Sequence, residues 1–248
     1  MVNSMNKKIL AIVEGEKKEP QLLNRLFDTY MVKKRKIVSY GSNLYDLYER
    51  LTDYVGDDFE SIDFLLFLKD LEPDENKKYI FDNSYTDIFL IFDFDPQDNR
   101  FSTVAIEKMM EYFNDSTSQG RLYINYPMIE SCVHIPSFKT EQYLYSIVRK
   151  DELWNYKTRA YEESCCPDIT KYNKLTFSRC IQFNLKKINH ILPEDWECFS
   201  DGLYDALKKI LDIQVQLLQN NEYFYILNTC LLCIYEYNPR MIEWLDRR

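Results

Sequence analysis

Glycine is scarce in this sequence. The chain has 5 glycines among its 248 residues, and none of them lies in a glycine-rich loop of the kind that surrounds nucleotide phosphates. This scarcity excludes a P-loop ATPase. Any dependence on ATP would therefore have to come from a partner protein.

Long apolar segments are also missing. The longest apolar stretch, at residues 223–237, is shorter than the roughly 18 residues of a membrane-spanning helix, and it includes Asn228, Thr229 and Glu236. The stretch predicts a buried helix and no membrane anchor. The amino-terminal sequence MVNSMNKK has neither the apolar core nor the cleavage site of a signal peptide, so we expect a cytoplasmic protein.

Cysteine indicates neither a disulfide framework nor a zinc site. The seven cysteines are an odd number at scattered spacings, which favours a reducing environment. Cys230 and Cys233 lie inside an apolar stretch, and Cys165 is adjacent to Cys166 without the two-residue spacer of a typical zinc-binding pair. We therefore expect buried thiols at these positions.

The charge of the chain is negative and unevenly distributed. The net charge of −9 argues against a protein that coats nucleic acid through bulk electrostatic attraction. Residues 1–120 contain 15 Lys and Arg residues against 23 Asp and Glu, whereas residues 121–248 contain 16 against 17. The excess of acid therefore belongs to the first half of the chain.

One segment of the second half is locally basic. Residues 137–187 contain 10 basic side chains against 6 acidic ones, with aromatic residues between them. The segment can face a polyanion, although an ordinary solvated helical surface has the same composition. The basic residues are Lys139, Arg149, Lys150, Lys157, Arg159, Lys171, Lys174, Arg179, Lys186 and Lys187, and the aromatic ones include Tyr143, Tyr145, Trp154, Tyr156, Tyr161 and Tyr172.

Apolar strands and amphipathic helices alternate in the first half of the chain. Strands are predicted at residues 9–13, 37–40, 88–92 and 121–127, and helices after Pro20, over residues 43–55 and from Ser102 or Thr103. This alternation predicts an α/β domain, a parallel sheet flanked by helices, over residues 1–135 with an insertion at about 56–84. Residues 136–248 are predicted to form a mostly helical carboxy-terminal region, with helices over residues 203–218 and 223–237.

Acidic side chains follow two of the predicted strands. Glu14 comes directly after residues 9–13, and Asp93 and Asp95 follow residues 88–92. Parallel sheets bind ligands at the carboxyl ends of their strands, so these acids meet at one edge if the two strands are neighbours. Close carboxylates raise one another's pKa unless a cation or hydrogen-bond donors lie among them. The pattern therefore predicts a site for Mg²⁺, with Mn²⁺ as a substitute.

These residues resemble the Toprim domain, which topoisomerases, bacterial primases and the OLD-type and RloB-like nucleases share. Its signature is an apolar strand ending in Glu-Gly and a later strand ending in Asp-x-Asp. The segments VEGEKKEP (13–20) and NYPMIES (125–131) are similar to RloB-like chains. The resemblance covers roughly residues 7–135. It implies a nuclease that acts in bacterial anti-phage defence beside a partner ATPase.

The resemblance and the chemistry of phosphodiester cleavage suggest roles for the strand-end acids. Asp93 and Asp95 would anchor one Mg²⁺ ion, which stabilises the charge that the transition state places on phosphate oxygens. Because alternate residues of a strand share one face, these two carboxylates are expected to point the same way. Glu14 would be a further ligand or the general acid and base. The substrate would be DNA or RNA, including tRNA.

Further residues are candidates for supporting roles. Glu19, Asp98 or Glu130 would hold a second metal ion or its water molecules. Lys17 or Lys139 would contact the phosphate that is cleaved. Sequence alone does not choose between the two lysines.

Two positions depart from the family's pattern. Gln97 stands where many Toprim domains have a third acid, and Lys18 stands where RloB-like chains usually have a hydroxyl residue. The number of metal ions is therefore open, as is homo-oligomerisation. The sequence also allows a non-catalytic Toprim-like module that binds a partner protein or nucleic acid, and it allows acids that merely form turns.

Overall fold

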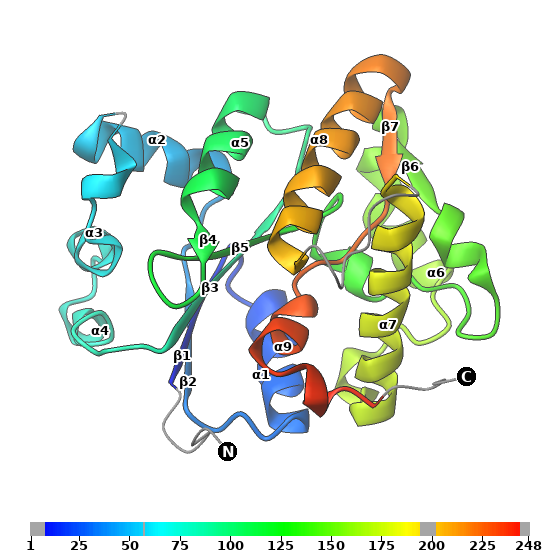
Figure 1. Cartoon of the computed structure of the whole chain (residues 1–248), viewed down its shortest axis with the longest axis horizontal. Helices are drawn as coiled ribbons and strands as arrows, with labels where there is room; N and C mark the ends of the chain where they lie inside the picture. Colours follow the sequence, from blue (N-terminus) through cyan, green and yellow to red (C-terminus); the bar gives the residue numbers. More distant parts are fainter. Residues whose placement is uncertain (1–7, 57, 194–201, 244–248) are drawn as a thin grey trace.

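Five strands form the central sheet of the protein (Figure 1). The computed structural model describes residues 8–56, 58–193 and 202–243. The strand order is β2-β1-β3-β5-β4, with β4 antiparallel at one edge and the other four strands parallel. The bounds are β1 (Ile9–Val13), β2 (Arg35–Ser39), β3 (Asp87–Asp93), β4 (Asn114–Asp115) and β5 (Gly120–Asn125).

The two strands that precede the acids are neighbours. β1 and β3 are buried along their whole length, as their continuous apolar sequences predict for inner strands of a parallel sheet. They pair in parallel with Ile9 opposite Asp87 and Val13 opposite Ile91. Their carboxyl ends therefore lie side by side, which confirms the condition on which a shared site depends.

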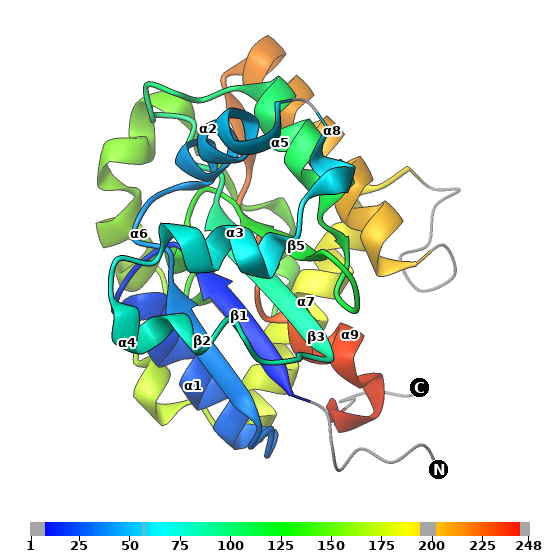
Figure 2. The ribbon, with the colours of Figure 1, turned by 90° about the vertical axis from the view of Figure 1, so that its left-hand side faces the viewer.

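Helices cover both faces of the sheet. α3 lies in front of the strands in Figure 2, and α1 lies behind them. Side-chain caps fix where two helices begin, because Asn43 and Ser102 accept hydrogen bonds from the backbone N–H groups of Asp46 and Ala105. The bounds are α1 (Lys18–Thr29), α2 (Leu44–Val55), α3 (Phe64–Leu71), α4 (Glu75–Lys78) and α5 (Thr103–Tyr112). The predicted α/β class, a mostly parallel sheet flanked by helices, is confirmed.

The chain after β5 adds helices and a two-stranded sheet. β6 and β7 pair in antiparallel fashion, and α7 and α8 lie beside each other. The helix predicted over residues 203–218 is present as α8. The bounds are η3 (Ile129–Cys132), β6 (Ile147–Arg149), η5 (Lys150–Asn155), α6 (Tyr156–Glu162), α7 (Lys174–Ile191), α8 (Leu203–Asn221), β7 (Tyr223–Tyr225) and α9 (Leu232–Tyr237), where η denotes a 3-10 helix.

The prediction of a single helix over residues 223–237 is wrong. Glu222, with a φ angle of 56°, ends α8, and the aromatic residues that follow pair with β6 as strand β7. Leu227 then bridges to Tyr126, and only Leu232–Tyr237 is helical. Aromatic residues favour strands, and a strand partner is available here, so tertiary pairing prevails over the apolar pattern.

Residues after β5 share their core with the sheet. The ring of Phe94, directly after β3, contacts those of Phe101, Tyr126 and Phe224 at centroid distances of 5.4, 5.0 and 5.3 Å. The boundary predicted at residue 135 stays a prediction. None of the helices within the described ranges combines the length and the apolar composition that a membrane crossing requires.

Candidate functional site

Glu14 and Asp93 lie against each other at the carboxyl edge of the sheet. Glu14 follows β1, Asp93 ends β3, and the Oε2 atom of Glu14 accepts a hydrogen bond of 3.0 Å from the backbone N–H of Asp93. The side chain of Asp93 is buried, and its Oδ1 accepts a hydrogen bond of 3.3 Å from Nδ2 of Asn125 on β5. Three adjacent strands therefore build this part of the site.

Glu19 joins the pair from the first turn of α1. Its carboxylate is buried, and the backbone N–H groups of Glu19 itself and of Gly15 act to lower its pKa. A Cβ atom at position 15 would lie 2.7 Å from Oε2 of Glu19, which is too close. The glycine after Glu14 thus leaves room for a second carboxylate beside the strand end.

Burial and mutual repulsion destabilise the ionised forms of these acids. Burial raises the pKa of Glu14 to about 7, and the charges of Glu19, Asp95 and Asp98 contribute to this rise. The hydrogen bond from the backbone N–H of Asp93 acts in the opposite direction and lowers it. The pKa of Asp93 is raised by burial and then by Glu14 and Glu19.

Within the part of the chain that the structure describes, this cluster has no ion-pair partner, although the charge of Lys18 acts to lower the pKa of Glu19. Burial raises the pKa of Glu19, and the charge of Glu130 raises it further. Among the described residues, the carboxylates of Glu14, Glu19 and Asp93 form no ion pair. The site therefore concentrates negative charge that a bound cation would relieve.

Asp95 lies in a turn and not on the strand. β3 ends at Asp93, and Asp95 has a φ angle of 34°, in the left-handed region that Asp tolerates better than most residues. The rule that alternate residues share a strand face therefore does not apply to it. Its carboxylate is half-buried and has a raised pKa because of burial and the charge of Asp98. Its charge also raises the pKa of Glu14, so it lies within electrostatic reach of the cluster.

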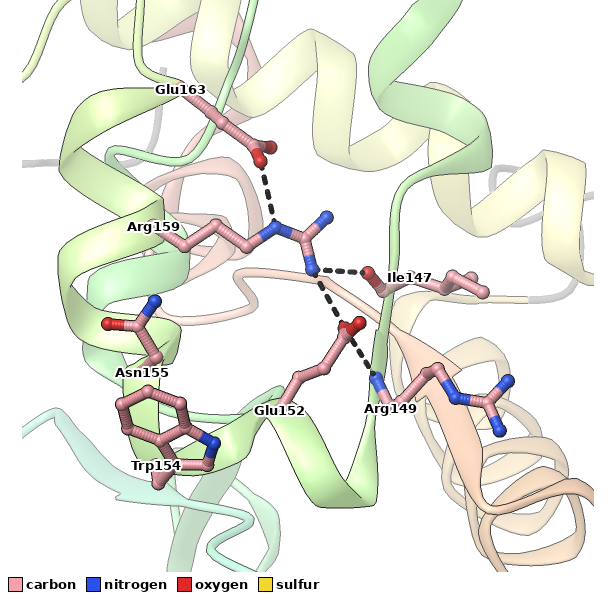
Figure 3. Close-up of a pocket in the computed structure, with 7 residues that line it drawn as sticks. All are labelled: Ile147, Arg149, Glu152, Trp154, Asn155, Arg159 and Glu163. Carbon is pink, nitrogen blue, oxygen red and sulfur yellow. Dashed lines mark hydrogen bonds and ion pairs between the residues drawn. The ribbon is translucent and has the colours of Figure 1, made fainter.

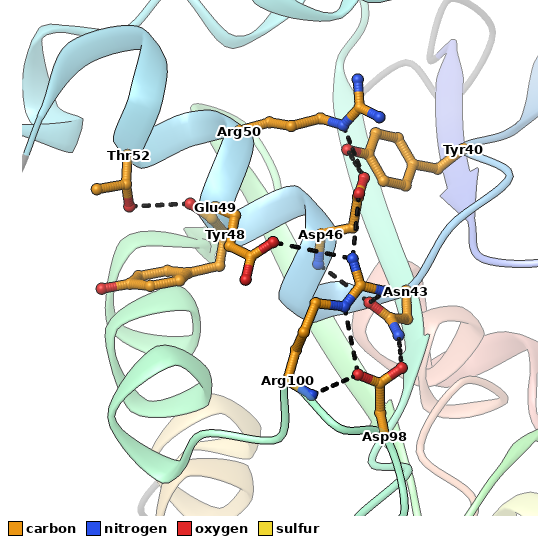
Figure 4. Close-up of polar contacts among 9 residues, drawn as sticks. All are labelled: Tyr40, Asn43, Asp46, Tyr48, Glu49, Arg50, Thr52, Asp98 and Arg100. Atoms are coloured by element: carbon orange, nitrogen blue, oxygen red, sulfur yellow. Dashed lines mark hydrogen bonds and ion pairs between the residues drawn. The ribbon is translucent and has the colours of Figure 1, made fainter.

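Asp98 is held by a separate polar network, which Figure 4 shows. Its Oδ1 accepts hydrogen bonds from the backbone N–H and Nε of Arg100 at 2.8 and 3.3 Å, and its Oδ2 accepts one of 2.5 Å from Asn43. Arg100 also pairs with Asp46 at 3.3 Å. Partial burial acts to raise the pKa of Asp98, but the bonds from Arg100 and Asn43 outweigh it and lower the pKa. Asp98 is thus compensated, unlike Glu14 and Asp93.

Glu130 is compensated by two lysines. It is buried in η3, and its Oε1 lies 2.9 Å from Nζ of Lys18 and 3.2 Å from Nζ of Lys157. Burial acts to raise the pKa of Glu130, but the hydrogen bond and charge of Lys18 and the charge of Lys157 lower it. Glu130, which the sequence suggests as a metal ligand, therefore already has two cationic partners.

The two candidate lysines lie in different places. Lys17 is exposed at the start of α1, two residues before Glu19. Lys139 is exposed after η3, and within the described ranges no hydrogen bond or ion pair links it to the acidic residues. Lys17 lines a hollow together with Lys18, which directly precedes Glu19 in α1.

Polar residues that the sequence did not single out connect the site to the carboxy-terminal region. Nδ2 of Asn228 donates to Oδ1 of Asn125 at 2.9 Å and to Oγ of Ser131 at 3.2 Å, and Asn125 in turn bonds to Asp93. The backbone N–H of Asn228 donates to Oδ1 of Asn184 on α7 at 2.9 Å. The sequence holds one sign of this network, which is the position of Asn228 inside an apolar stretch. A polar side chain that is buried there needs hydrogen-bond partners.

We predict that Asn228→Ala lowers the free energy of unfolding by about 1–3 kcal/mol, because it leaves buried partners of the amide unsatisfied. Urea denaturation measures the change. Asn220→Ala is the control, because Asn220 is exposed near the end of α8 and should change stability by no more than about 0.5 kcal/mol. Equal effects of the two substitutions would contradict the structural role of this network.

The predicted metal site is not preformed as a cage of side chains. Within the described part of the chain, no group of three or more His, Cys, Asp or Glu side chains is arranged to hold a metal ion. Comparison of the chain with protein-family models, with curated proteins and with solved structures found no match.

Proposed function

We propose that this chain is a metal-dependent nuclease of Toprim type, which cleaves phosphodiester bonds in DNA or RNA with Mg²⁺ or Mn²⁺. One observation carries the proposal. Glu14 and Asp93, from the ends of two neighbouring parallel strands, place adjacent carboxylates at the ligand-binding edge of the sheet without a cationic partner in the described residues.

The donor set suits Mg²⁺. This ion is usually held by one or two carboxylates together with water molecules and substrate phosphates, so a cage of three acids is not required. Asp93, fixed by its hydrogen bond from Asn125, is the residue to hold it, with Asp95 or Glu19 as the second carboxylate. When bound, the ion supplies positive charge that stabilises the phosphate oxygens in the transition state.

Glu14 suits proton transfer. General acid–base catalysis is most efficient when the pKa of the catalytic group lies near the working pH, and burial raises the pKa of Glu14 to about 7. The backbone N–H of Asp93 holds its Oε2 in place. Glu14 would take a proton from the attacking water and return one to the leaving oxygen. Asp98 and Glu130, which are compensated by Arg100 and the lysines, are assigned supporting roles in the structure of the site.

A non-catalytic module remains the second candidate. Gln97, exposed at the position of the usual third acid, and the absence of a preformed metal cage in the described residues favour it. Such a module would bind a partner protein or nucleic acid through the same edge. The roles in anti-phage defence and with a partner ATPase rest on the resemblance alone.

Cleavage of a mixed panel separates the two candidates. Supercoiled plasmid, single-stranded DNA and total tRNA are incubated with the protein in Mg²⁺, Mn²⁺ or EDTA, and the double variant Asp93→Asn/Asp95→Asn is the matched control. We expect cleavage by the native protein only with metal, and none by the variant. Cleavage that persists in the variant would overturn the nuclease assignment, and so would a native protein that cuts none of the substrates in either metal.

We predict that Gly15→Ala reduces metal-dependent cleavage at least about tenfold, because the new methyl group displaces the carboxylate of Glu19. The free energy of unfolding should change by less than about 1 kcal/mol, since the atom that must move is the end of a flexible side chain. Gly56→Ala is the control, with the opposite pattern of effects on stability and cleavage. Gly56 has a φ angle of 73° and open space around it, so the substitution should cost stability without affecting cleavage. Unchanged cleavage in Gly15→Ala would contradict a role for Glu19.

A further inference from the structure

An exposed row of aromatic and basic side chains lies on η5 and α6. Trp154 lies near the end of η5, and Lys157 and Tyr161 follow on α6; all three are exposed, within eight residues that span about 10 Å of helix. Leu153, Tyr156 and Ala160 of the same segment are buried. Trp154 is 79% exposed, an uncommon state for so large an apolar side chain. These three residues, together with Lys17 and Lys18, are called the α6 strip below.

The α6 strip reaches the acidic cluster through α1. Nζ of Lys18 contacts the hydroxyl of Tyr161 and lies 4.5 Å from the centre of its ring. Lys18 and Lys157 share the carboxylate of Glu130, which holds both ammonium groups at one place. Lys18 directly precedes Glu19. The row of side chains therefore ends beside the acids at which cleavage is proposed.

A hollow of about 360 Å³ lies at this junction. Its lining includes three lysines and the ring of Tyr161, and the described residues provide no ion pair for Lys17. The lining residues with polar or charged ends are Lys17, Lys18, Gln21, Lys157, Tyr161, Asp168 and Thr170. Three lysines against one aspartate leave the lining of this hollow positive, although the chain as a whole carries −9.

The far end of the α6 strip borders a second hollow of about 430 Å³ (Figure 3). Arg159 is held there by Glu163 at 2.9 Å and by Glu152 at 3.4 Å, so its charge is compensated. Figure 3 shows Trp154 at the rim, apart from this ion-pair network. Its indole N–H donates to no acceptor within the described residues. The ring and its N–H are therefore available to a ligand.

We propose that the α6 strip binds single-stranded nucleic acid, with bases stacked on Trp154 and Tyr161 and phosphates beside Lys17 and Lys157. The inference rests on the proposed function, to which it adds the class of substrate. Aromatic side chains between cationic ones match a chain of bases and phosphates, since every base has a face that can stack. A duplex hides these faces inside its base stack, so it leaves the aromatic residues without partners.

Binding in EDTA tests this site without any need for cleavage. Fluorescence anisotropy is measured with labelled oligo(dT), oligo(U) and a duplex of equal length. We expect both single strands to bind more tightly than the duplex, and Trp154→Ala to raise the Kd about 5- to 150-fold. Trp154→Phe, which retains a stacking ring, should restore most of the affinity. Lys17→Gln should reduce the slope of log K against log salt by about 0.7.

Tyr79→Ala is the matched control for loss of an exposed aromatic ring. Tyr79 is 56% exposed at the end of α4, which lies at the opposite side of the molecule from α6 in Figure 1. Its substitution should leave the Kd unchanged. Three results would each overturn the proposal that the α6 strip binds single strands. They are an equal loss of affinity in Tyr79→Ala and Trp154→Ala, no binding of single strands, and tighter binding of the duplex.

The two proposals fail separately. If Trp154→Ala weakens binding in EDTA but the native protein cuts nothing in the metal panel, the α6 strip stands and the nuclease assignment falls. If the native protein cuts with metal but Trp154→Ala binds like the native chain, the nuclease assignment stands and the binding role of the α6 strip is wrong.

Discussion

Asp93→Asn is expected to reduce metal-dependent cleavage by about 100-fold or more. The substitution replaces a buried carboxylate that lies at the end of β3 between Glu14 and Asn125. An amide of the same shape keeps the hydrogen-bonding geometry but removes the negative charge that attracts the cation. Initial rates of cleavage on the preferred substrate, at saturating Mg²⁺, measure the effect.

Asp98→Asn is the matched control for this prediction. Asp98 is another acid of the same segment, but Arg100 and Asn43 already satisfy its carboxylate. We expect its substitution to lower cleavage less than about tenfold. The reverse order, with Asp98 essential and Asp93 dispensable, would place the metal in the network of Arg100 and contradict the site described above.

Glu14→Gln is expected to stabilise the metal-free protein at alkaline pH. The pKa of Glu14 is raised by burial from 4.5 to about 7 in the folded protein. A raised pKa of an acid means that the folded state binds the proton more tightly, so stability from this group is complete below pH 4.5 and is lost as the pH rises through about 7. The native protein should therefore lose about 1–3 kcal/mol of stability relative to Glu14→Gln between pH 4.5 and pH 8.

Urea denaturation of both proteins in EDTA at these two pH values measures the difference. Mn²⁺ should raise the stability of the native protein at pH 8, by about 2.7 kcal/mol when its concentration is 100 times the Kd. At pH 4.5 the effect should be much smaller, because protons compete with the metal for the carboxylates. Parallel pH profiles for the native protein and Glu14→Gln would contradict the electrostatic description of the cluster.

The sheet and the position of the acids were predictable because their signals are local. Continuous apolar runs at residues 9–13 and 88–92 mark inner strands of a parallel sheet, and the acids that follow them are read directly from the sequence. Asn43 and Ser102 likewise mark helix starts. The structure confirms the pairing of the strands, on which the convergence of Glu14 and Asp93 depends.

The compensation of individual acids was not predictable, because it depends on contacts between distant segments. Glu130 meets Lys18 from α1 and Lys157 from α6, which lie 112 residues before it and 27 after it in the sequence. Asp95 lies in a turn and not on the strand, because its backbone has a positive φ angle. No local sequence pattern predicts this conformation. The 223–237 stretch was misread because β7 acquires its partner, β6, only in the folded chain.

The most direct test of the metal site is a calorimetric titration of Mn²⁺ into the native protein and into Asp93→Asn at about pH 8, above the pKa of about 7 to which burial raises Glu14. We predict saturable binding by the native protein that Asp93→Asn abolishes or weakens at least about tenfold. Absence of binding to the native protein, or equal binding to both, would contradict a cation site formed by the acids at the ends of β1 and β3.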